Sequence, residues 1–237
     1  MLSTVDPHPT PPADGTGSPD GTTLGVEPGA QPPVGSRRAK DLTPANLRLF
    51  KAAADAFSDK GFHGTTTRDI ASRAGLSPAG VYVHFASKED LLFQLSRDGH
   101  VIARDELRLA AEQADGPAAA LRAVVVSFAR WHAENYQVAR IVQYEFRHLS
   151  EDHRAEVLTL RKEIDGVVRN VIEQGIASGE FAVDDVRLTV LSIMSMVVDV
   201  ARWYHPGVRE SAEQIATTYG DLAVRLVSAG TAGTARA

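Results

Sequence analysis

The chain contains no cysteine among its 237 residues, which excludes a disulfide framework and a thiolate metal site. No apolar run approaches the roughly 18 residues that a membrane-spanning helix needs, so we expect no contact with a membrane. The N-terminus lacks a basic segment followed by an apolar run, which is how a secretory signal begins. From these absences we expect a cytoplasmic protein.

Sequence motifs for enzyme chemistry are missing as well. We find no G-x-S-x-G, no glycine-rich loop for phosphate and no pair of histidines with a carboxylate at metal-ligand spacing. His148 and His153 are five residues apart across an expected helix break, a spacing that does not suit one helix face. We therefore predict no catalytic residue, no bound metal and no cofactor.

Basic residues are scarce overall but concentrated in one segment. The net charge is −5, yet residues 37–90 hold nine Lys and Arg against six Asp and Glu. Residues 1–36 hold four acids and no Lys or Arg, and the remainder of the chain is net negative. This division is typical of a small domain that meets nucleic-acid phosphate beside a larger domain with another task.

The first 36 residues contain eight of the twelve prolines, and no apolar period is visible in them. We expect residues 1–40 to be a disordered tail with a basic arm, and residues 230–237 to be a disordered C-terminus. Arg37 and Arg38, in the arm "SRRAK", allow two readings of equal weight: a solvated linker, or an arm that contacts DNA phosphates.

Residues 41–90 have the signals of a helix-turn-helix. After a first helix from Thr43-Pro44 to Gly61, two short helices follow over residues 66–85, joined by a turn at Gly75. The second begins with small residues, so its backbone can approach the DNA major groove closely, and Tyr82 is placed to reach bases or phosphates. The residues expected to contact DNA are Arg37, Arg38, Thr66, Thr67, Ser77, Pro78, Ala79, Gly80, Tyr82, His84 and Lys88, the last through a phosphate.

The rest of the chain, residues 91–229, has helical periodicity and no alternating strand pattern, so we predict an all-α fold. The helix expected over 184–204 is apolar on more than one face, and the helix over 211–228 has apolar residues at 4-3-4 spacing. Such faces pack either within the chain or against a second copy, and we favour a symmetric dimer. Its expected interface residues are Leu191, Met194, Val197, Ile215, Tyr219, Leu222 and Leu226.

The stretch "AFSDKGFHGTTTRDIASRAGLSPAGVYVHFASKEDLL" resembles the N-terminal region of the TetR family of bacterial transcriptional regulators. The matching positions include Gly61, Phe62, Thr66, Thr67, Ile70, Ala71, Gly75, Ser77, Tyr82, His84, Phe85, Lys88 and Leu91. One departure is the order Ala79-Gly80, where many relatives have glycine first and a hydroxyl residue second. The resemblance implies an N-terminal three-helix DNA-binding domain and a C-terminal helical domain for ligand binding and dimerisation. It further implies a homodimeric repressor that leaves a palindromic double-stranded operator when a small effector binds.

The segment "DVARWYHPGVRESAEQIATTYGDLAVRLV", residues 199–227, resembles an actinobacterial subgroup that governs fatty-acid or sterol catabolism. That resemblance implies an acyl-CoA-like effector, and a regulator of efflux or other metabolism that senses another hydrophobic ligand is the alternative. Arg202 either pairs with Asp199 or contacts the effector. The residues expected to bind ligand are Arg202, Trp131, Phe128, Tyr144, Phe146 and Val198.

Overall fold

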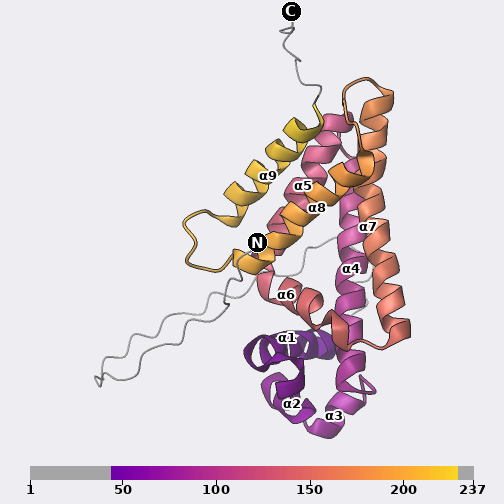
Figure 1. The fold of residues 1–237 in the computed structure, drawn as a ribbon. Helices are drawn as coiled ribbons and strands as arrows, with labels where there is room; N and C mark the ends of the chain where they lie inside the picture. The colour runs from indigo at the N-terminus through magenta and orange to yellow at the C-terminus, as the bar shows by residue number, and fades with distance from the viewer. Residues whose placement is uncertain (1–43, 229–237) are drawn as a thin grey trace, which may run out of the picture.

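The computed structural model describes residues 44–228, and its regular elements are helices (Figure 1). The segments predicted to be disordered, 1–40 and 230–237, lie outside the described residues. Within residues 44–228 the one strand-like pairing is an isolated bridge between Phe181 and Ser228, so the predicted all-α fold is confirmed. The elements are α1 (Pro44–Gly64), α2 (Thr67–Ala74), α3 (Pro78–Tyr82), α4 (Lys88–Glu112), α5 (Pro117–Glu134), α6 (Tyr136–Tyr144), the 3₁₀ helix η1 (Glu145–His148), α7 (Glu151–Ala177), α8 (Val186–Trp203) and α9 (Ala212–Val227).

Side-chain caps fix where several of these helices begin. The hydroxyls of Ser87, Ser150 and Ser211 accept N–H bonds at the starts of α4, α7 and α9, over 2.9, 3.3 and 3.2 Å. The Asp185 carboxylate does the same for α8, at 2.9 Å from the Leu188 nitrogen. Each such cap is worth about 1 kcal/mol, because it satisfies an N–H that the helix itself cannot pair.

The helices α1, α2 and α3 form a head at one end of α4 (Figure 1). Phe57, Ile70 and Phe85 are almost wholly buried in its core, together with Leu91 from the first turn of α4. The domain boundary expected at residue 90 therefore falls just inside a helix that runs on without interruption into the body. One continuous helix, α4, therefore belongs to both the head and the body.

The body is built around α5, which contacts α4, α7, α8 and α9. Its core is aliphatic, with Leu107, Leu121, Ile172 and Ile193 almost inaccessible to solvent. Glycine at position 220 lets α9 approach α5 closely, because a Cβ there would lie 2.5 Å from Cγ2 of Val126. None of the described helices is both long and apolar enough to cross a membrane.

Helix α6 joins the two parts of the molecule. It packs against α1 of the head and α8 of the body, and it lies between them in Figure 1. Helix α6 ends at Tyr144, and the chain continues directly as the 3₁₀ helix η1. This change of helix type brings Glu145 and His148 against the end of α1.

Candidate functional site

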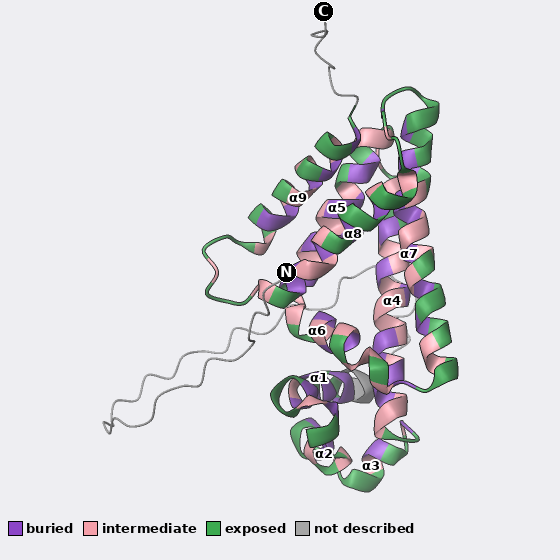
Figure 2. Cartoon of the chain, in the orientation of Figure 1, coloured by how far each residue is buried: buried purple, intermediate pink, exposed green. Residues whose placement is uncertain are grey.

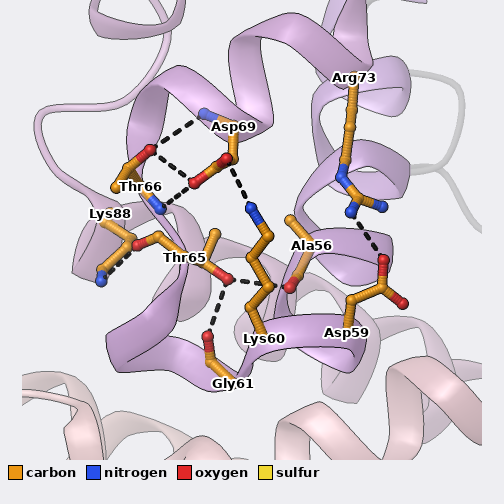
Figure 3. Close-up of polar contacts among 9 residues, drawn as sticks. All are labelled: Ala56, Asp59, Lys60, Gly61, Thr65, Thr66, Asp69, Arg73 and Lys88. Atoms are coloured by element: carbon orange, nitrogen blue, oxygen red, sulfur yellow. Dashed lines mark hydrogen bonds and ion pairs between the residues drawn. The ribbon is translucent and has the colours of Figure 1, made fainter.

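The first helix of the helix-turn-helix is held in place by a reciprocal cap. The Thr66 hydroxyl accepts the Asp69 N–H at 3.1 Å, and the Asp69 carboxylate accepts the Thr66 N–H at 2.8 Å (Figure 3). Lys60 of α1 reaches the same carboxylate at 2.8 Å. This ion pair and the bonds from Thr66 lower the pKa of Asp69 well below its usual range.

The turn between α2 and α3 has the geometry that the sequence predicted. Gly75 adopts φ 69°, a left-handed conformation that residues with side chains rarely take, and the Leu76 N–H then closes the turn on the Ala71 carbonyl at 2.9 Å. On α3, the Ser77 hydroxyl accepts the Gly80 N–H at 3.1 Å, and Val81 is buried. The second helix is therefore anchored on one side only.

Helix α3 is shorter than predicted, because it ends at Tyr82 rather than near Phe85. The residues that the sequence assigned to DNA contact nevertheless lie on its outer side. Ser77, Pro78, Ala79 and Tyr82 are exposed, and Gly80 and His84 are half-buried. Figure 2 shows that much of α3 is exposed and that α3 lies at the end of the molecule away from α9.

The two helices of the motif are also linked on their exposed side. The Thr67 hydroxyl at the start of α2 lies 3.2 Å from the Tyr82 hydroxyl at the end of α3. Either oxygen can donate, and the Tyr82 side chain is otherwise accessible to solvent. Thr67 thus orients a side chain that the sequence places at the DNA.

The structure gives Lys88 a different role from the phosphate contact that we expected. Its ammonium group donates to the carbonyls of Phe62 and Thr65, at 2.5 and 2.8 Å, and lies 4.3 Å from the centre of the Phe62 ring. The Thr65 hydroxyl in turn donates to the carbonyls of Ala56 and Gly61 (Figure 3). Lys88 therefore closes the C-terminal end of α1, where carbonyls lack helical partners. Arg37 and Arg38 lie outside the described residues.

A cavity of about 270 Å³ opens between α4, α5, α6, α7 and α8 in the body. Phe128, Trp131 and Val198, three of the residues expected to bind ligand, line it. Most of its wall is apolar, and the residues that line it are Ser96, Gly99, His100, Ala103, Phe128, Trp131, His132, Val138, Ala139, Val142, Gln143, Arg161, Ile164, Asp165, Met194, Ser195 and Val198.

Polar groups gather on the α4 and α7 side of this cavity. His100 donates from Nδ1 to the Ser96 carbonyl at 2.7 Å, since a carbonyl can only accept. Its other nitrogen, Nε2, accepts from Nε of Arg161 at 3.2 Å, which fixes the ring as the neutral Nδ1–H tautomer. Arg161 also donates from Nη2 to the Val142 carbonyl at 3.1 Å, while its Nη1 has no hydrogen-bond partner within residues 44–228.

The charges on this wall nearly balance. Asp165 stands one turn after Arg161 on α7, and burial raises the pKa of its carboxyl while Arg169 and Arg161 oppose the rise. Burial also lowers the pKa of His100 and His132 to about 4, so both rings are neutral at neutral pH. The wall thus offers one guanidinium, one carboxyl and two neutral imidazoles.

Three of the residues expected to bind ligand are not in the cavity. Arg202 is exposed and makes two bonds to the Asp199 carboxylate, at 2.7 and 2.8 Å, so the alternative of an ion pair on its own helix is the one observed. Tyr144 is exposed on α6 and does not line the cavity. Phe146 packs against the core of the head, and the guanidinium carbon of Arg161 lies 4.5 Å from its ring centre.

The expected dimer residues divide into two sets. Leu191, Leu222 and Leu226 are exposed, as is Leu188 beside them, so α8 and α9 present an unpaired apolar surface. By contrast, Met194, Val197 and Ile215 are buried inside the chain, and Tyr219 is half-buried against the same core. For these four the intrachain alternative holds, because the helices are apolar on two faces and these residues lie on the inner one.

Sequence reasoning did not single out Ser96, His100, His132 or Arg161 for the cavity. A signal was present, because His100 and His132 follow the apolar faces of their helices, among buried residues such as Val101 and Phe128. Arg161 likewise follows buried Leu160 and precedes buried Ile164. Polar residues on core-facing positions are uncommon, and here they mark the cavity.

Comparisons with known proteins give one family match in the head and another in the body. Residues 49–95 match the family model of bacterial regulatory proteins of the tetR family, and residues 114–227 match that of the tetracyclin repressor-like C-terminal domain. The HTH-type transcriptional repressor KstR2 of Mycolicibacterium smegmatis is 32% identical over 182 residues, which cover 74% of this chain and 88% of that protein.

Two solved structures extend the likeness to the fold. The ketosteroid transcriptional regulator KstR2 of Mycobacterium tuberculosis has a TM-score of 0.72 at 26% identity, covering 79% of this chain and 97% of that one. AibR, solved in complex with isovaleryl coenzyme A and operator DNA, has a TM-score of 0.68 at 23% identity, covering 75% of this chain and 97% of that one. The KstR2 relatives also bear out the resemblance of the C-terminal half to the fatty-acid and sterol subgroup. The chain therefore belongs to the tetR family of bacterial regulatory proteins.

Proposed function

We propose that this chain is a cytoplasmic transcriptional repressor that binds a palindromic operator as a homodimer and leaves it when an acyl-CoA thioester occupies the body cavity. The observation that carries this proposal is the position of the cavity, whose wall includes α6, the helix that also packs on the head. The repressor KstR2 and the AibR complex with isovaleryl coenzyme A and operator DNA support it by analogy.

A physical path connects the cavity with the head. Val142 lines the cavity, and its carbonyl accepts a hydrogen bond from Arg161. Two residues later α6 gives way to η1, where Glu145 accepts the Phe62 N–H at 3.3 Å and the His148 ring stacks on the Phe62 ring at 4.9 Å. A ligand that shifts α6 therefore displaces the end of α1, and with it the head.

Dimerisation explains how such a displacement releases DNA. Two heads read two half-sites at a fixed spacing, so a change in their separation lowers affinity without unfolding either head. The exposed leucines 188, 191, 222 and 226 on α8 and α9 supply apolar side chains for contact with the second copy. Release follows if the ligand binds more tightly to the dimer whose heads are at the wrong separation for the operator.

The cavity also suits a thioester in its chemistry. The apolar lining accepts an acyl chain, and the free Nη1 of Arg161 can donate to the thioester carbonyl. A coenzyme A nucleotide is too large for 270 Å³, so it extends through the mouth of the cavity. The near balance of Arg161 against Asp165 favours a neutral carbonyl over a free carboxylate.

The test is a competition experiment on DNA. The protein is first bound to a fluorescent DNA duplex taken from the region upstream of its own gene. Dodecanoyl-CoA, dodecanoate or coenzyme A is then titrated in while the fluorescence anisotropy of the duplex is followed. We expect the thioester alone to release the duplex. Release by dodecanoate as readily as by the thioester, or by neither, contradicts an acyl-CoA effector and leaves a regulator that senses another hydrophobic ligand.

A further inference from the structure

Two residues of the cavity wall carry a polar atom that makes no hydrogen bond to the part of the chain that the structure describes. The hydroxyl of Ser96 is buried and makes no hydrogen bond within residues 44–228. His132 is also buried, and its Nδ1 lies 2.9 Å from the Phe128 carbonyl. Because that carbonyl only accepts, Nδ1 carries the proton, and Nε2 is left with a lone pair to which no described residue donates a hydrogen bond.

The His100 ring cannot satisfy these atoms. His100 is used on both sides, since it donates to the Ser96 carbonyl and accepts from Arg161. Both imidazoles are neutral at neutral pH, because burial lowers the pKa of each to about 4. Beside the free Nη1 of Arg161, this wall therefore carries one buried acceptor, on His132, and one buried hydroxyl that can both donate and accept, on Ser96.

We infer that the effector carries a hydroxyl group within its apolar body, which donates to Nε2 of His132 and accepts from the Ser96 hydroxyl. A hydroxyl is the smallest neutral group that does both. This inference rests on the proposed role of the cavity as the effector site and names the class of effector that binds best: a hydroxylated acyl or alicyclic compound, with a plain saturated chain such as dodecanoyl as a weaker ligand.

Other groups at this position are less favourable. A saturated chain leaves the His132 acceptor and the Ser96 hydroxyl buried and unpaired, which disfavours its binding. A carboxylate has no proton to donate at neutral pH, and it would bring a second negative charge near Asp165. A carbonyl accepts from Ser96 but faces the His132 lone pair with another lone pair.

Small aromatic probes test this requirement without any coenzyme A. Toluene, anisole and phenol have similar shapes, but only phenol donates a hydrogen bond. The full-length protein is labelled with ¹³C at the methionine methyl groups, because Met194 lines the cavity whereas Met196 does not and serves as the internal control. Each probe is titrated while the Met194 methyl signal is followed by NMR.

We expect phenol to shift Met194 with a Kd about tenfold below that of toluene, although toluene is the more apolar probe, and anisole to bind like toluene. His132→Phe keeps a ring in place and removes the acceptor, so it should abolish the preference for phenol while toluene still binds. If that variant does not fold, Ser96→Ala is used instead and should reduce the preference in the same sense.

Equal affinities for phenol and toluene in the wild type would overturn the inference, as would an unchanged preference in the folded variant or a shift confined to Met196. The thioester experiment is independent of these outcomes. A phenol preference with no response to dodecanoyl-CoA removes the acyl-CoA proposal and leaves the hydroxyl requirement standing. The reverse pattern removes the hydroxyl requirement alone.

Discussion

The hydroxyl of Tyr82 lies 3.2 Å from that of Thr67, across the exposed side of the helix-turn-helix. This contact links Tyr82, the aromatic residue of α3, to Thr67, the first residue of α2. The side chain is 53% exposed, so its role is not to fill the core. It is the natural starting point for testing how the head meets DNA.

Replacing Tyr82 should weaken operator binding without unfolding the head. We expect Tyr82→Ala to lower operator affinity about tenfold, in the range of one lost direct contact, and Tyr82→Phe to lower it less. The measurement is anisotropy with operator and scrambled duplexes, alongside a thermal melt. Unchanged affinity of Tyr82→Ala for the operator would remove this residue from the interface.

Lys88 should matter for stability rather than for phosphate contact. Lys88→Met removes the donor from the Phe62 and Thr65 carbonyls, and we expect the free energy of unfolding to fall by about 1–3 kcal/mol. The salt dependence of DNA binding should not change, because no phosphate contact is lost. Lys51→Met, at an exposed position of α1, is the matched control for charge. A variant of normal stability whose salt slope drops by about one would restore the phosphate role.

Replacing Arg161 should weaken the response to the effector, whereas replacing Arg202 should not. We expect Arg161→Met to raise the thioester concentration needed for operator release at least about tenfold, because the guanidinium lines the cavity and holds α6 through Val142. Arg202→Ala should leave it unchanged, since Arg202 is exposed and paired with Asp199. Loss of response in the Arg202 variant with a normal Arg161 variant would reverse this assignment.

Acid should destabilise the protein partly through His132. Burial lowers the pKa of this ring from 6.5 in the unfolded chain to about 4 in the folded one. Between these values the unfolded chain binds a proton that the folded chain does not, so the free energy of unfolding falls as the pH falls, by about 1.4 kcal/mol per pH unit. The free energy of unfolding, measured with urea at several pH values from 7 to 5, should depend less steeply on pH for His132→Phe than for the wild type. Identical slopes would mean that the ring is protonated in the folded protein.

Local signals were enough to predict the head and the helix order. Caps such as Thr66 and Ser77, and the glycine turn at Gly75, act within a few residues of the chain, so their effect is visible in the sequence alone. The predicted α3 is too long because the chain leaves the regular helix after Tyr82, while Phe85 packs into the core of the head just beyond it.

The cavity and the dimer surface depended on tertiary neighbours. Periodicity showed that α8 is apolar on two faces, but not that Val197 faces the body while Leu191 faces solvent. Arg202 and Arg161 both stand on helices with an apolar face. Only the packing of α7 against α4, with the bond from Arg161 to the Val142 carbonyl of α6, places Arg161 at the cavity. Side chains that long can reach in several directions, so their partners are set by the fold.

Native mass spectrometry of the operator complex tests the central claim most directly. We predict a complex of two 25.4 kDa chains on one duplex, which Leu226→Glu reduces to free chains and DNA while Leu109→Glu, at an exposed leucine of α4, does not. Adding dodecanoyl-CoA should yield free duplex and thioester-bound dimer. A single chain per duplex, or a duplex that keeps both chains with thioester bound to each, would contradict the account.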